Sequence, residues 1–169
     1  SGYSPAEIEG LVLSEDFKGA AEGKINSKFV PYYKNNGEDA SLVKLNLSLD
    51  STLAPSLPTN LISPVEIDYS LMEVFSGPAA VANYNFDSLM IPFRCVSSDI
   101  ETKTPLIFSS GSLNQAVRTS FTYPFYLKPI RIDGRLLFDG GLYNNFPADI
   151  MYDEFFPDFI IAMVASLSS

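Results

Sequence analysis

The 169-residue chain contains no histidine and a single cysteine. Without histidine it cannot build a Ser-His-Asp relay from its own residues. The lone Cys95 excludes an internal disulfide. It could act as a nucleophile in principle, but no histidine is present to activate it, so a buried core thiol is the expected role. The longest apolar run, Phe159 to Ala165, is far shorter than the ~20 residues that a membrane-spanning helix needs.

Basic residues are also scarce. Eleven Lys and Arg stand against 20 Asp and Glu, which gives a formal net charge of −9 and a pI near 4.3. A phosphate backbone would be repelled, so a nucleic acid is not expected as a partner. The apolar fraction of 46% and the charged fraction of 18% are typical of one globular domain with a buried core. No cluster of metal-ligating residues stands out, and neither a metal nor another cofactor is predicted.

Helix-start signals recur along the chain. Ser4-Pro5-Ala6-Glu7 and Ser63-Pro64-Val65-Glu66 both have the capping-box pattern, and Ser112 is placed to cap a third helix. The second of these helices is expected to stop at Gly77-Pro78, because proline interrupts a helix. Helices are therefore predicted over residues 4–13, 14–21, 63–76, 112–120 and 147–156.

Apolar runs between these helices predict strands. Asp133-Gly134 has the composition of a two-residue hairpin turn, and the unbroken apolar run from Phe159 to Val164 is typical of a strand covered on both faces. A further hairpin is expected from about Lys28 to Asp50, followed by a Pro-, Ser- and Thr-rich loop at 53–61. The remaining strands are predicted over 90–99, 105–108, 129–132 and 135–138. Helices that alternate with buried strands indicate a layered α/β fold.

The run from Phe138 to Pro147 is the strongest candidate for chemistry. It reads Phe-Asp-Gly-Gly-Leu-Tyr-Asn-Asn-Phe-Pro, so Asp139 ends an apolar strand and is followed by Gly140 and Gly141. An Asp-Gly pair is usually a structural turn, and that interpretation stays open. The second glycine favours a site, because it indicates either backbone at positive φ or a close approach by other atoms. Sites of α/β proteins also gather at strand ends.

The order of motifs from residue 113 to residue 147 resembles that of the patatin-like phospholipase family. That family has a helix ending in Arg-Ala-Ser-x-Ser-x-Pro, an Asp-Gly hairpin, and an Asp-Gly-Gly/Ala motif close to Asn-x-Pro. The similar runs here are Val117 to Pro124, Asp133-Gly134, Asp139-Gly140-Gly141 and Asn145-Phe146-Pro147. Each motif alone is weak, but their order and spacing together are specific. The strand ending at Asp99 and the opening segment, residues 2–9, are similar to family segments as well.

The resemblance implies an α/β fold, a three-layer α/β/α patatin-like sandwich. In that family a serine on a Gly-x-Ser-x-Gly elbow works with an aspartate, which would be Asp139, beside a glycine-rich oxyanion loop. This chain contains no Gly-x-Ser-x-Gly; its nearest imitation, Gly111-Ser112-Leu113, lacks the elbow pattern. The sandwich is therefore expected to be incomplete. Residues 1–169 would be the C-terminal larger part of a single patatin-like domain, without the N-terminal strands, elbow and oxyanion loop, and with the hairpin at 28–50 as an insertion.

Several residues are candidates to support Asp139. Gly140 and Gly141 would form its loop, and Asn145 either orients this loop or caps the following helix. Arg118 pairs with Asp99 or with a carbonyl behind the site, or it is simply a solvated arginine at a helix end.

For Asp99 the favoured interpretation is an Asx turn at a strand end. Phe138, Leu142 and Phe146 would wall the Asp139 carboxylate with apolar surface, which strengthens its pull on a serine proton.

The predicted function is that of a bacterial patatin-like lipid acyl hydrolase, a phospholipase A or esterase, to which this chain supplies the aspartate but not the serine. The implied substrate is a phospholipid or another acyl ester. The alternative is a non-catalytic patatin-fold module that binds a partner or a lipid; an acidic glycan-binding domain has no motif behind it. The resemblance does not decide where the protein is located: the cytoplasm stays open, and so does the bacterial cell envelope or secretion. The hairpin at 28–50 either covers the cleft mouth or packs against the helix at 63–76.

The isolated chain should hydrolyse no ester, because it holds a base without a nucleophile. It should also self-associate, because a sheet that lacks its nucleophile strand exposes an apolar edge that invites pairing with another chain. Turnover of a p-nitrophenyl ester would contradict the first expectation. A clean monomer in sedimentation velocity would contradict the second.

Overall fold

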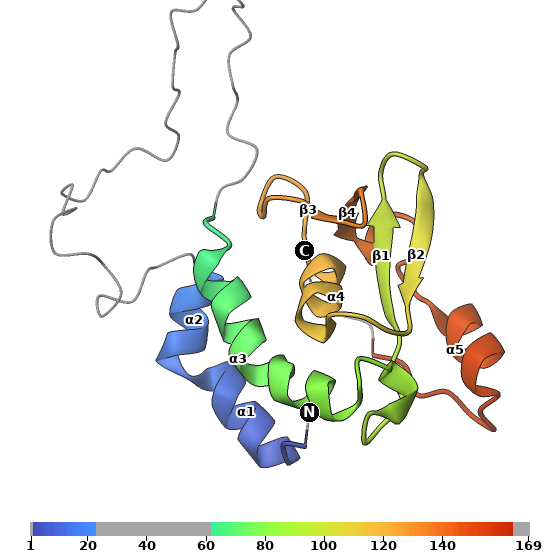
Figure 1. Cartoon of the computed structure of the whole chain (residues 1–169), viewed down its shortest axis with the longest axis horizontal. Coiled ribbons are helices and arrows are strands. Elements are labelled where there is room, and N and C mark those ends of the chain that lie inside the picture. The colour runs from blue at the N-terminus through green and yellow to red at the C-terminus, as the bar shows by residue number, and fades with distance from the viewer. Residues whose placement is uncertain (1, 23–61, 164–169) are drawn as a thin grey trace, which may run out of the picture.

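A computed structural model describes residues 2–22 and 62–163 (Figure 1). The hairpin predicted at 28–50 and the loop at 53–61 lie outside the described residues. Helices α1 (Pro5–Leu13), α2 (Glu15–Ala21) and α3 (Val65–Val81) come first along the chain. The elements that follow are η2 (Phe86–Ser88), β1 (Cys95–Asp99), β2 (Thr104–Phe108), α4 (Leu113–Ser120), β3 (Ile130–Ile132), β4 (Arg135–Asp139), η3 (Gly140–Leu142) and α5 (Ala148–Phe155), where η denotes a 3-10 helix.

The four strands form one antiparallel sheet in the order β2-β1-β4-β3. β1 lies inside the sheet and is the most buried strand. It pairs with β4 so that Ser97 stands opposite Asp139, and Asp99 stands opposite Leu137. The register therefore brings the end of β4, with its candidate carboxylate, against the middle of the most buried strand.

Helix α4 packs on one face of this sheet, and α5 lies near the other. On one face, the hydroxyl of Ser97 is hydrogen-bonded to that of Thr119 in α4. Side chains alternate along a strand, so the neighbouring Val96 points to the other face, where it lines a small cavity with Ile150 of α5. Helix α3 packs on α4, and α1 and α2 lie beyond it (Figure 1). The predicted mixed α/β fold is confirmed.

The apolar core lies between α3, α4 and the sheet. Its buried members are Ala79, Phe86, Cys95, Leu113 and Ala116. Burial raises the pKa of the Cys95 thiol, whose Sγ donates to the carbonyl of Ala116 at 3.0 Å. The predicted role of this cysteine as a core thiol is confirmed. Among the described residues, no helix combines the length and the apolar character needed to cross a membrane.

The first capping box forms as predicted. Ser4 Oγ accepts from the Glu7 main-chain N–H at 3.4 Å, and Glu7 Oε2 accepts from the Ser4 main-chain N–H at 2.7 Å. The Ser4 main-chain N–H, followed by the Ser4 hydroxyl, which donates to the same carboxylate oxygen at 2.8 Å, lowers the pKa of Glu7. Ser14 caps α2 through the Phe17 N–H at 3.2 Å.

The other two predicted caps are wrong. The N-cap of α3 is Pro64, which makes no side-chain cap bond. Ser112 occupies the N-cap position of α4, but its hydroxyl donates to Asn114 Oδ1 at 2.5 Å instead of receiving a main-chain N–H. A nearby amide oxygen thus competes successfully for the hydroxyl.

The predicted end of α3 at Gly77-Pro78 is also wrong, because the helix continues to Val81 with Pro78 inside it. An internal proline costs a helix about 3 kcal/mol. Beyond it, Ala79 and Ala82 are both 4% exposed, and Ala79 belongs to the core. Burial of these two alanine side chains favours the continuation of the helix past Pro78.

Two strand predictions need correction. Only the second half of the predicted strand at 90–99 is extended in the sheet, since β1 begins at Cys95. Residues 159–163 form no strand and are exposed, with Ile161 at 88% and Met163 at 97%; Val164 lies outside the described residues. A strand needs a neighbour for its hydrogen bonds, and no described strand pairs with this run.

The hairpin turn between β3 and β4 has the predicted form. Asp133 and Gly134 both have positive φ, 48° and 82°, as a type I′ turn requires. Gly134→Ala should lower the free energy of unfolding by about 1 kcal/mol, because a side chain is strained in this conformation. Asp133→Asn should change it by less than about 0.5 kcal/mol. Urea unfolding followed by tyrosine fluorescence measures both, since the chain has no tryptophan; equal stability of the two variants would contradict the turn type.

Candidate active site at the end of strand β4

Asp139 is the last residue of β4, and its carboxylate is held by its own loop. Oδ1 accepts the main-chain N–H of Gly141 at 2.8 Å, which makes Asp139 the side-chain cap of η3. The residue is half-buried. Within the described part of the chain, the other carboxylate oxygen, Oδ2, has no hydrogen-bond partner. The loop therefore orients the carboxylate through one oxygen and leaves the second available.

Gly140 is required by a close approach of main chain and not by its φ. A Cβ atom at this position would lie 2.5 Å from the carbonyl oxygen of Val96 and 2.8 Å from its carbonyl carbon. Neither Gly140 nor Gly141 has positive φ. Of the two reasons for glycine considered above, close approach is the correct one for Gly140. The contact brings the turn after Asp139 directly onto β1.

Gly141 lies between two polar side chains. A Cβ atom there would meet Asn145 Oδ1 at 2.8 Å and Asp139 Oδ1 at 3.3 Å. The structure therefore brings Asp139, Gly140, Gly141 and Asn145 together in one loop. Asn145 does not cap α5, whose N-cap is Pro147 without a side-chain cap bond, so the helix-cap interpretation of this residue is wrong.

The next residue, Asn144, does contact the start of α5. Its amide nitrogen lies 3.2 Å from Asp149 Oδ1. This hydrogen bond, together with the Ile150 N–H, lowers the pKa of Asp149. Of the two consecutive asparagines, Asn144 ties the loop to α5, while Asn145 lies against Gly141.

The three side chains predicted to wall Asp139 with apolar surface are all partly exposed, and the wall itself stays a prediction. Phe138 is half-buried, but Leu142 and Phe146 are 47% and 53% exposed.

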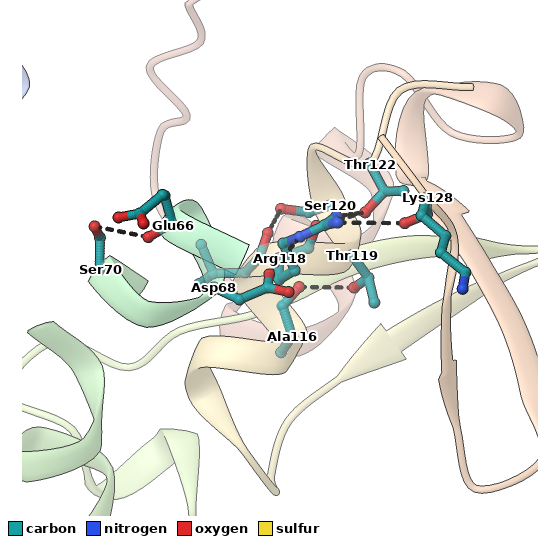
Figure 2. A network of polar contacts seen from close by, with 10 residues as sticks. Glu66, Asp68, Ser70, Ala116, Arg118, Thr119, Ser120, Thr122 and Lys128 are labelled. Carbon is teal, nitrogen blue, oxygen red and sulfur yellow. Dashed lines mark hydrogen bonds and ion pairs between the residues drawn. The ribbon is translucent and has the colours of Figure 1, made fainter. Parts of the chain in front are cut away.

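Arg118 is buried, and its partners differ from the predicted one. Its side chain is 4% exposed, and Nε donates to Asp68 Oδ1 of α3 at 2.7 Å. Nη2 donates to the carbonyl of Lys128 at 3.2 Å, and Nη1 donates to the hydroxyl of Thr122 (Figure 2). The pairing with Asp99 and the solvated-arginine interpretation are both wrong, whereas the predicted bond to a carbonyl is present.

Thr122 was not singled out from the sequence, yet it links Arg118 to the candidate site. Its hydroxyl contacts Arg118, and its carbonyl accepts the main-chain N–H of Asp139 at 3.0 Å. It is fully buried. The only signal in the sequence was its position after the Arg-Thr-Ser that ends the helix, and this position does not indicate a hydrogen bond to Asp139, 17 residues further along the chain.

Asp99 lies apart from the Asp139 loop, at the far end of β1. Its Oδ1 accepts from the N–H groups of Glu101 and Thr102 at 2.9 and 3.2 Å, which is the predicted Asx turn. Burial pushes the pKa of Asp99 up, but these hydrogen bonds and the charge of Arg135, 3.8 Å from Oδ2, outweigh it and lower the pKa. Its role is local, at the turn between β1 and β2.

The described residues place a carboxylate at the end of β4 without a hydroxyl bonded to it. Within residues 2–22 and 62–163, no serine or threonine hydroxyl is hydrogen-bonded to the Asp139 carboxylate. In the same part of the chain, no three His, Cys, Asp or Glu side chains come together as a metal site requires. The loop can accept a proton from a hydroxyl that reaches it.

Comparison with known proteins points to one family. The model of the family described as patatin-like phospholipase matches residues 17–152. The chain is 34% identical over 102 residues to the human protein named patatin-like phospholipase domain-containing protein 6, a match covering 54% of this chain and 7% of that protein. It is 32% identical over 98 residues to neuropathy target esterase sws of Drosophila melanogaster, covering 53% and 7%.

A third relative matches over a longer stretch. Patatin-like phospholipase domain-containing protein 7 of Rattus norvegicus is 29% identical over 151 residues, which is 86% of this chain. That match covers 10% of the rat protein. The chain thus spans a small share of the length of the curated relatives it matches.

Replacement of Gly140 should test the close approach at the site. Gly140→Ala should lower the free energy of unfolding by about 1–3 kcal/mol, since a methyl group must displace main chain. Gly77→Ala is the matched control, because a Cβ at this helical position meets nothing within 4 Å; it should leave stability unchanged or raise it by about 0.5–1 kcal/mol. Urea unfolding measures both, and a neutral Gly140→Ala would show that β1 and the turn are not in contact.

Proposed function

The chain belongs to the patatin-like phospholipase family, and from this premise we propose that its parent protein is a serine lipid acyl hydrolase in which Asp139 is the base of a Ser-Asp dyad. The reaction would be that of a phospholipase A or an esterase. The serine hydroxyl would lose its proton to Asp139 as its oxygen attacks the acyl carbonyl. The ester bond would break as the departing alcohol takes that proton from Asp139, and water would then hydrolyse the resulting acyl-enzyme and restore the serine.

The state of the Asp139 carboxylate is the observation that supports this role best. One oxygen is fixed by the Gly141 N–H at 2.8 Å, and the other has no hydrogen-bond partner among the described residues. A general base needs a fixed orientation and a free lone pair within about 2.6–3.2 Å of the proton donor. Asp99 also has one bonded and one unpaired oxygen, but its unpaired oxygen is buried and lies 3.8 Å from Arg135, whereas Asp139 is half-buried at a strand end.

The glycines and Asn145 would serve this arrangement. Gly140 lets the turn lie on β1, and Gly141 leaves room for both the Asp139 carboxylate and the Asn145 amide. We propose that Asn145 limits the rotation of the loop and that the pair of glycines sets its path. None of the three would take part in the bond changes.

The serine and the oxyanion loop would come from another part of the parent protein's domain, because this chain has no Gly-x-Ser-x-Gly. In this proposal residues 1–169 form the larger C-terminal part of the domain and supply the base alone. The names of the relatives contain "phospholipase" and "esterase", and the proposed substrate is accordingly a phospholipid or another acyl ester.

Asp139→Asn in the parent protein should abolish ester hydrolysis while leaving the melting temperature nearly unchanged. Asparagine keeps the shape and the oxygen that accepts the Gly141 N–H, but it cannot take a proton from serine. Loss of a general base typically costs about 10²–10⁴ in rate. The measurement is kcat on a short soluble ester, with thermal unfolding alongside.

Asp133→Asn is the matched control, since it makes the same chemical change six residues away in a turn that Asn-Gly forms equally well. It should keep the wild-type rate. Undiminished hydrolysis by Asp139→Asn would refute the dyad. A parent protein without activity that still binds lipid vesicles would favour the non-catalytic binding module instead.

A further inference from the structure

We infer that Arg118 is a positioning residue for Asp139, acting through Thr122, whose main-chain carbonyl holds the Asp139 N–H. The inference rests on the proposed role of Asp139 as the base. It concerns the placement of the carboxylate and not its chemistry.

Arg118 joins three segments that meet behind the candidate site. Its guanidinium bonds Asp68 of α3, the hydroxyl of Thr122 in the loop after α4, and the carbonyl of Lys128 just before β3 (Figure 2). Its charged group lies 5.7 Å from the ring centre of Phe121, close enough for a cation–π contact. The planar guanidinium, with five N–H donors, can bond three separate groups at once, whereas a lysine ammonium is a compact point charge.

Thr122 transmits this arrangement to Asp139. Its N–H donates to the Thr119 carbonyl at 3.0 Å, and its hydroxyl donates to the Arg118 carbonyl at 2.6 Å. Its own carbonyl is then aimed at the Asp139 N–H, 3.0 Å away. Thr122 is 0% exposed, so water does not compete for these bonds.

The sheet itself does not hold Asp139 on this side. Strand β3 pairs with β4 from Arg135 only as far as Leu137, which stands opposite Ile130. Beyond that point β3 and β4 are not paired, and the Lys128 carbonyl is bonded to Arg118 instead. The Thr122 carbonyl therefore takes the place of a β3 partner for the Asp139 N–H, and Arg118 fixes both segments at once.

Such placement bears directly on the rate. A base must be held within about 0.5 Å of its productive position, and a shift of 1 Å can cost about 10²-fold. On one side Asp139 pairs with Ser97 of β1. On the other side its main-chain N–H is held by Thr122, which is bonded to Arg118. Loosening this link should lower kcat and spare substrate binding.

Arg94 provides a matched control, because it is a second largely buried arginine bonded to two carboxylates. It contacts Asp87 at 2.7 Å and Glu154 at 3.0 Å, and its side chain is 11% exposed. It also lies over the ring of Phe155 at 5.0 Å. None of its described partners is bonded to Asp139, so Arg94→Lys removes a comparable fork without touching the link.

The experiment compares Arg118→Lys, Thr122→Val, their combination and Arg94→Lys in the intact parent protein. Arg118→Lys and Thr122→Val should each lower kcat about 10- to 100-fold on a soluble ester, with KM within about twofold. The double variant should be little worse than either single variant, because both break one link. Arg94→Lys should keep the wild-type kcat even where it lowers the melting temperature.

A second readout follows the link without using activity. Hydrogen exchange of the peptide carrying the Asp139 N–H should be faster in Arg118→Lys and Thr122→Val, while a peptide from β2 should exchange as in the wild type. If Arg118→Lys does not fold, Thr122→Val, which keeps the side-chain shape, decides the question. Unchanged kcat and exchange in Thr122→Val, or equal losses of kcat in Arg118→Lys and Arg94→Lys, would overturn the inference.

These outcomes are separable from those of the proposed function. Full activity of Asp139→Asn refutes the dyad whatever Arg118 does. An inactive Asp139→Asn beside a fully active Thr122→Val with normal exchange keeps the dyad and removes the positioning role.

Discussion

The contact between the turn at Gly140 and the main chain of Val96 is the constraint on which the candidate site depends. A Cβ atom added at Gly140 would lie 2.5 Å from the carbonyl oxygen of Val96, so the contact has no space for even a methyl group. This contact extends the pairing of β4 with β1 past the last ladder residue, Asp139. The carboxylate is consequently placed by packed main chain and not by a flexible loop.

A second layer of polar side chains lies between α4 and the sheet. Ser97, Thr119, Arg118 and Thr122 are all 3% exposed or less, and each has hydrogen-bond partners. Burying such groups is costly unless they are paired, and these hydrogen bonds remove most of that cost. One helix thus packs on apolar side chains at its beginning, through Leu113 and Ala116, and on polar ones at its end.

Local signals predicted some local features of this molecule and failed at others. The capping box at Ser4 and the Asp133-Gly134 turn form, because each depends on residues within three positions, but the caps predicted at Ser63 and Ser112 do not form. The loop at Asp139 also agrees with its sequence pattern. Where a distant partner decided the outcome, the predictions were wrong: Pro78 stays helical because Ala79 and Ala82 are buried, and the apolar run at 159–163 forms no strand because no described strand pairs with it.

The sequence by itself determined the family, the mixed α/β class and the identity of the candidate carboxylate, because these depend on the order and spacing of short motifs. Only the tertiary structure decided what surrounds that carboxylate. It showed that position 140 must be glycine because it lies against the main chain of Val96, 44 residues earlier in the chain. It also showed that Arg118 bonds Asp68 and Thr122 and not Asp99. Contacts of this kind arise from the register of β1 against β4 and the packing of α3 on α4, and a linear pattern of residue types does not specify which distant side chains such packing brings together.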